Sequence, residues 1–115
     1  MKENRKYYAI VEVSTRTDVL DDVAIFENSA NNPTYTSAII SEYEDTDGNG
    51  LGAAYDEAKA EFTANYTEAE VKKIEGTNEY DVKFWTLTHF TDYVNDDGSE
   101  HSEAEDLDVS HFPQM

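Results

Sequence analysis

Oxygen-bearing side chains gather around a glycine-rich turn near the middle of the chain. They are Asp45, Asp47, Asn49, Asp56 and Glu57, with glycines at positions 48, 50 and 52 among them. Hard cations such as Ca²⁺ take about six to eight oxygen ligands. Side chains at alternate positions around a sharp turn can converge on one point, so this stretch is a candidate calcium site and Ca²⁺ is the only cofactor that we consider.

Residues 45–56 resemble the EF-hand calcium loop. Oxygen side chains stand at loop positions one, three and five, a glycine at six and a carboxylate at twelve. The resemblance implies a calcium-binding module at 45–57. Gly52 departs from the pattern, because the family has an aliphatic residue there. The alternative is a simple turn from a strand into a helix, since Asx residues and glycines favour turns.

The largest group of carboxylates lies in the C-terminal part of the chain, where residues 92–108 contain no Lys or Arg. We predict a partner-binding surface made by this group and by a second acidic stretch. Its residues are Asp92, Tyr93, Asp96, Asp97, Glu100, Glu103, Glu105, Asp106, Asp108, Glu42 and Glu44. Such an array can replace phosphates in a groove lined by Lys and Arg, with aromatic side chains as anchors. The alternative is a solvated segment that keeps the chain soluble.

The formal charge of the whole chain is −18, from 26 Asp and Glu against 8 Lys and Arg in 115 residues. A globule of this length has a radius of gyration of about 13 Å and a diameter of roughly 35 Å. Its net charge would then be spaced at ~2 Å, close to the ~1.7 Å of duplex DNA. Such a surface attracts basic proteins and repels nucleic acid. In composition and size the chain looks like phage and mobile-element inhibitors of restriction or CRISPR effectors.

Catalytic patterns are missing from the sequence, so we expect no enzyme. There is no cysteine, and the histidines His89, His101 and His111 are too far apart to share a helix face. No serine stands in a nucleophile-elbow context. No apolar run approaches the ~20 residues of a membrane span. We expect a cytoplasmic protein without membrane contact, in the host cytoplasm if a phage encodes it.

The pattern of apolar residues predicts an α+β fold with a small antiparallel sheet of three to four strands. The expected strands are 6–13, 23–27, 35–43 and 79–94. One main helix, 52–65, is expected to pack on one face of the sheet, followed by a short second helix at 68–75, where Thr67 and Glu70 form a capping-box pattern. We expect residues 1–94 to form a single compact domain. Residues 95–115 would be an acidic C-terminal segment, partly disordered.

Segment 79–94 leaves two arrangements open. Tyr80, Val82 and Phe84 alternate onto one face of a strand, whereas Trp85 and Leu87 occupy the other. Either both faces are covered there, or a bulge near Phe84 and Trp85 switches the phase.

Three functions follow from these residues. The leading hypothesis is a small acidic binding protein that mimics nucleic acid and inhibits a basic nucleic-acid-binding partner, of the anti-restriction or anti-CRISPR type, without binding nucleic acid itself. The second is the calcium-binding module at 45–57. The third is an acidic accessory protein of a phage or bacterium with no inhibitory role. The sequence does not define the oligomeric state.

Overall fold

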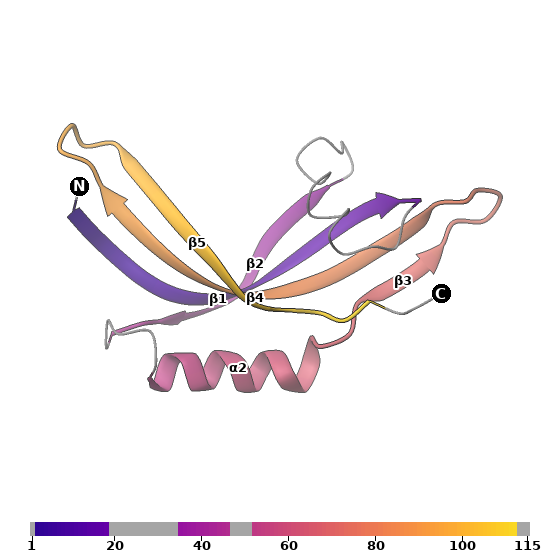
Figure 1. The fold of residues 1–115 in the computed structure, drawn as a ribbon, viewed down its shortest axis with the longest axis horizontal. Helices are drawn as coiled ribbons and strands as arrows, with labels where there is room; N and C mark the ends of the chain where they lie inside the picture. Colours follow the sequence, from indigo (N-terminus) through magenta and orange to yellow (C-terminus); the bar gives the residue numbers. More distant parts are fainter. Residues whose placement is uncertain (1, 19–34, 47–51, 113–115) are drawn as a thin grey trace.

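The computed structural model describes residues 2–18, 35–46 and 52–112. The elements are β1 (Lys2–Thr17), β2 (Thr36–Glu44), α2 (Ala53–Asn65), β3 (Glu70–Lys73), β4 (Tyr80–Val94) and β5 (Glu100–Val109). Neighbouring strands are antiparallel, in the order β2-β1-β4-β3, and β5 also pairs with β4 (Figure 1). The predicted strand at 23–27 lies outside the described residues.

The predicted α+β class is wrong. The described chain is mostly β, with five strands in one curled sheet and α2 as its single helix. The segment 68–75, predicted as a second helix, contains β3, in which Val71 pairs with Val82 of β4. The capping-box pattern is a local signal, whereas pairing with the edge of β4 supplies the backbone hydrogen bonds of this segment.

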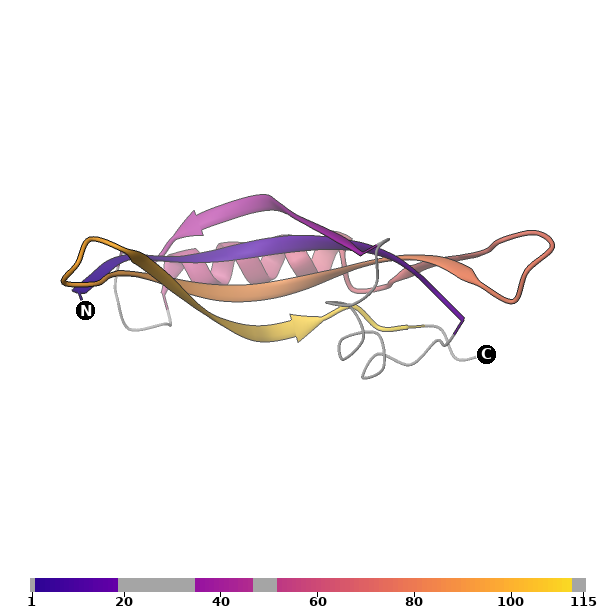
Figure 2. The same cartoon turned by 90° about the horizontal axis from the view of Figure 1, so that it is seen from above.

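Strand β4 is the centre of the sheet. It pairs with β1 from Lys2↔Val94 to Thr17↔Tyr80. On its other edge β4 pairs first with β3 and then with β5, so these two short strands follow one another along the same edge. The result is a long, bent ribbon that measures 52 × 34 × 19 Å, narrow when seen from above (Figure 2).

Apolar side chains cover both faces of the ribbon. On the face that carries α2, here the helix face, Ile10 and Leu87 pack with Phe62 of the helix. On the opposite, concave face, Val82 and Phe84 form a second cluster. Register runs without interruption through Phe84 and Trp85, so there is no bulge at this point. Of the two arrangements expected for 79–94, the one with both faces covered is confirmed.

Helix α2 forms where the spacing of apolar residues predicted it. Ala58 and Phe62 are buried one turn apart, which is the helical repeat of a face packed on a sheet. Glu61 ties the helix to β2, because its carboxylate accepts hydrogen bonds from Ser41 Oγ and Tyr43 Oη, both at 3.1 Å. Among the described residues no helix is long and apolar enough to cross a bilayer.

The acidic C-terminal segment contains regular structure. Residues Glu100–Val109, in the part of the chain where partial disorder was expected, form β5 and pair with β4 from Thr86 to Val94. Apolar alternation gives no signal for this strand because its side chains are almost all exposed.

Candidate partner-binding site

The β4–β5 hairpin presents the predicted acidic surface. Its turn is closed by Asn95 N–H donating to Ser99 C=O at 2.8 Å, and Gly98 takes the positive φ of 86° that the turn requires. Asp97 accepts from Ser99 Oγ at 2.6 Å and from Ser99 N–H at 3.0 Å. These two hydrogen bonds lower the pKa of the Asp97 carboxyl. The turn therefore holds one carboxylate in its charged form at the tip of the hairpin.

Strand β5 is exposed along its length, from Glu100 to Asp108. Within the described part of the chain it pairs only with β4, so its outer edge carries no neighbouring strand there. The β5 carboxylates, as we call them here, are Glu100, Glu103, Glu105, Asp106 and Asp108. They lie on a strand that projects acids to both sides of the sheet.

The register divides these acids between the two faces. Glu103 and Glu105 lie opposite Thr91 and His89, on the helix face, and Asp108 joins them opposite Leu87. Glu100 and Asp106 belong to the concave face. The register shift next to Leu87 leaves Leu107 as the extra residue of β5, which is why the neighbouring acids Asp106 and Asp108 fall on opposite faces.

No basic side chain neutralises the β5 carboxylates. Among the described residues, none of the five has a Lys or Arg nitrogen within the 4.0 Å of an ion pair. Their partners are weaker: Glu103 lies 3.6 Å from His101 Nε2, and Asp106 accepts a hydrogen bond from Thr88 Oγ1 at 2.9 Å. Within the described residues, no Lys or Arg ion pair therefore offsets the charge of this strand.

The other predicted acids differ in this respect, because Arg5 binds two of them. Its guanidinium donates to Glu44 at 2.6 Å and to Glu42 at 3.1 Å, and it covers the ring of Tyr7 at 3.9 Å. The hydrogen bond that Arg5 donates to Glu44, and then the one it donates to Glu42, raise the pKa of Arg5 above its usual range. Glu42 and Glu44 are thus held in ion pairs by β1.

The N-terminal end of the chain, which carries Lys2, Arg5 and Lys6, lies beside the acidic hairpin in the fold. The N-terminal end of β1 runs beside the hairpin, with Arg5 opposite Asp92. Asp92 in turn accepts a hydrogen bond from Ser102 Oγ at 2.7 Å. Tyr93 stacks on His101, with ring centroids 6.2 Å apart. Asp96 lies with Asp97 in the turn. The structure therefore brings the predicted C-terminal residues together on one hairpin, and Glu42 and Glu44 lie two strands away.

The predicted calcium residues do not meet in the described structure. Asp47 and Asn49 lie outside the described residues. Asp56, in the first turn of α2, and Glu57, which follows it, are exposed. The carboxylate of Asp45 is 2% exposed and its Oδ2 lies 3.2 Å from His89 Nε2. A strand, β2, precedes the loop, where an EF-hand has a helix. Within the described ranges no three His, Asp or Glu residues form a group that could hold a metal ion.

A serine that no sequence pattern singled out anchors β5. Ser110, directly after the strand, is 4% exposed. Its Oγ accepts from Trp85 N–H at 2.8 Å and donates to Tyr66 C=O at 2.7 Å. Ser110 thus ties the end of β5 to β4 and to the end of α2. A lone serine in a polar stretch gives no sequence signal for this role.

No protein-family model, curated protein or solved structure matches this chain.

Proposed function

We propose that this chain is a small acidic binding protein, and no enzyme, that imitates nucleic acid and inhibits a basic nucleic-acid-binding partner of the restriction or CRISPR kind. If a phage encodes it, it acts in the host cytoplasm, where such nucleases meet DNA. The supporting observation is β5, an exposed edge strand with five carboxylates and no Lys or Arg ion pair in the described structure.

The charge density along β5 is lower than that of a DNA strand. A β-strand rises about 3.3 Å per residue, so five carboxylates in ten residues give roughly one charge every 6.6 Å. A DNA strand has one every ~3.4 Å. Over the long axis of 52 Å, the net charge of −18 amounts to one unit per ~3 Å, sparser than the ~2 Å expected for a compact globule.

The distribution of cations favours one side of the molecule for contact. Arg5 neutralises Glu42 and Glu44 on β2, whereas no Lys or Arg of the described ranges forms an ion pair with β5. A cationic cleft would therefore gain most by approaching β5. Because this attraction is long-ranged and is screened over about 8 Å at physiological salt, association should be fast and should weaken as salt rises.

Displacement of DNA tests the proposal. A fluorescent duplex is bound to purified restriction endonucleases and, separately, to a guide-loaded Cas nuclease, and the chain is titrated in at several NaCl concentrations. We expect the chain to displace the duplex from at least one of these enzymes. The triple variant Glu100→Gln, Glu103→Gln and Glu105→Gln should need about tenfold more protein for the same effect, from three contacts of ~0.2–1 kcal/mol each.

A matched variant distinguishes binding through the β5 carboxylates from an effect of net charge alone. Glu57→Gln, Glu68→Gln and Glu75→Gln also remove three exposed carboxylates, but from α2 and the residues that follow it. Displacement by this variant should remain within about twofold of the original chain. Equal losses in the two variants would mean that only net charge matters, and no displacement from any enzyme would leave the acidic accessory protein as the better description.

A further inference from the structure

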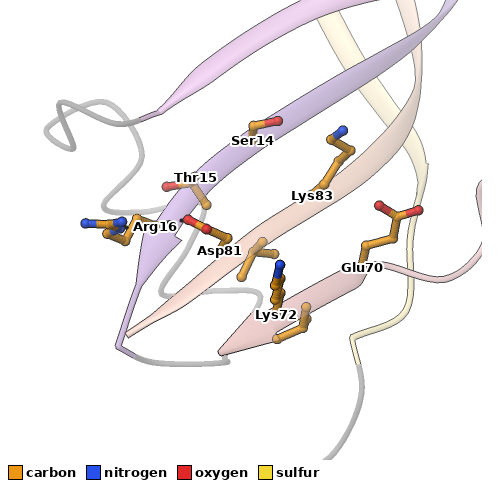
Figure 3. Close-up of a pocket in the computed structure, with 9 residues that line it drawn as sticks. Ser14, Thr15, Arg16, Glu70, Lys72, Asp81 and Lys83 are labelled. Atoms are coloured by element: carbon orange, nitrogen blue, oxygen red, sulfur yellow. Dashed lines mark ion pairs between the residues drawn. The ribbon is translucent and has the colours of Figure 1, made fainter. Parts of the chain in front are cut away.

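A hollow of about 540 Å³ lies on the sheet where β1, β4 and β3 run side by side (Figure 3). Three consecutive residues of each strand line it: Ser14–Arg16, Asp81–Lys83 and Glu70–Lys72. This is the size range of small-molecule sites, about 300–1,000 Å³. It lies apart from the β5 carboxylates, because β3 and β5 occupy successive parts of the β4 edge.

Cations are concentrated here in an otherwise acidic chain. Three of the eight Lys and Arg residues, Arg16, Lys72 and Lys83, line the hollow, each from a different strand. The register sets Ser14, Lys83 and Glu70 in one row across the sheet, and Arg16, Asp81 and Lys72 in the next. These two rows share the helix face, since Ser14 and Arg16 are in phase with Ile10 of the helix-side core.

Lys72 and Lys83 form no close ion pair with the described carboxylates. The nearest carboxylate oxygen to Lys83 Nζ, on Glu12, is 4.0 Å away. Among the described residues Lys72 has no carboxylate within that distance. Arg5, by contrast, is held by two carboxylates at hydrogen-bond distance. Arg16 lies 3.9 Å from Glu79 and 3.8 Å from Asp81. The charge of the two lysines is therefore available to a ligand, whereas the charges of Arg16 and Arg5 are already used in ion pairs.

We propose that this hollow binds a small phosphate ester that carries hydroxyl groups. The phosphate lies between the ammonium groups of Lys72 and Lys83, which donate charge-assisted hydrogen bonds to its oxygens. Glu70 and Asp81, beside these lysines in the two rows, accept hydrogen bonds from the hydroxyls. Such a ligand matches both signs of charge in the lining, whereas inorganic phosphate matches only the cations and is repelled by the two carboxylates.

Titration with two probes, followed by amide chemical shifts of the ¹⁵N-labelled chain, tests this site. The probes are ribose 5-phosphate and inorganic phosphate, at 0.1 M NaCl. We expect saturable shifts confined to Ser14–Arg16, Glu70–Lys72 and Asp81–Lys83, with tighter binding of the ester. Lys72→Gln and Lys83→Gln should each weaken its binding about three- to fivefold, the size of an exposed ion pair.

Two control variants make the outcome decisive. Lys59→Gln removes one charge from α2 and should leave the dissociation constants unchanged. Glu70→Gln should tighten inorganic phosphate and reduce the preference for the ester. No saturable shift with either probe, or equal weakening by Lys59→Gln, would overturn the proposal. Because the readout is a small ligand on β1, β3 and β4, it does not depend on whether the β5 carboxylates bind a nuclease.

Discussion

Removing the Ser110 hydroxyl should loosen the acidic strand from the rest of the fold. In Ser110→Ala, the backbone N–H of Trp85 loses its acceptor and the carbonyl of Tyr66 loses its donor. Ser110 N–H still donates to Trp85 C=O, so strand register is kept. The substitution therefore isolates one buried hydroxyl that links β5, β4 and the end of α2.

The expected loss of unfolding free energy follows from the burial of these groups. A buried polar group without a partner costs about 1–3 kcal/mol. Trp85 is 6% exposed, whereas Tyr66 is half-buried and its carbonyl can reach water in the variant. We therefore expect a loss of about 2–4 kcal/mol, measured by urea unfolding followed by circular dichroism. At about 4 °C per kcal/mol for this length, Tm should fall by roughly 8–16 °C.

Ser102→Ala is the matched control, because it removes the same group from within β5. Ser102 Oγ donates to Asp92 at 2.7 Å, but on an exposed surface, so its loss should cost no more than about 1 kcal/mol. Hydrogen exchange should also accelerate in β5 for Ser110→Ala and not for Ser102→Ala. If the two substitutions cost the same, the buried serine does not anchor β5 and the reasoning is wrong.

Further predictions concern the core, the net charge, the calcium hypothesis and the buried tyrosines. Phe62→Ala removes a buried ring from the helix-side core and should lower the free energy of unfolding, measured in urea, by about 3–5 kcal/mol, since Phe62 is 1% exposed. A loss below 1 kcal/mol would contradict that packing. Raising NaCl should increase Tm by screening the net charge. CaCl₂ and MgCl₂ at equal concentration should change Tm by the same amount, because the Asp45 carboxylate contacts His89. A rise in Tm specific to Ca²⁺ would favour the calcium module. Burial raises the pKa of Tyr7, Tyr8 and Tyr43, so their contribution to stability is complete below the ordinary value of about 10 and is lost as pH rises through the raised values. Tyrosine absorbance at high pH should show this late titration, together with unfolding, and simple titration of all tyrosines at the ordinary pKa would refute it.

Elements with an alternating or helical apolar pattern could be predicted from the sequence. The run of aromatic and β-branched residues at 6–13 lies within β1, and the predicted strands 35–43 and 79–94 correspond closely to β2 and β4. The helix predicted at 52–65 is α2. In β1, β4 and α2 apolar side chains are buried, and burial is what imposes the period on the sequence. Strand β2 is mostly exposed.

Elements defined by pairing alone could not be predicted. Strand β5 has acids on both faces and no buried face, so its sequence resembles that of a disordered segment. Strand β3 is four residues long and exists because β4 offers an edge. The same limit applies to the site. The acids could be identified from the sequence, but only the fold shows that Arg5 neutralises Glu42 and Glu44 and that β5 has no such ion pair in the described part of the chain.

Carboxylate footprinting of a complex shows whether the β5 carboxylates form the contact surface. The chain is treated with a water-soluble carbodiimide and an amine, alone and bound to the nuclease from which it displaces DNA best, and modification is located by mass spectrometry. Glu100, Glu103 and Glu105 should become protected in the complex, while Glu57 and Glu75 react as in the free chain. Equal modification of the β5 carboxylates in the free and bound chain would contradict it.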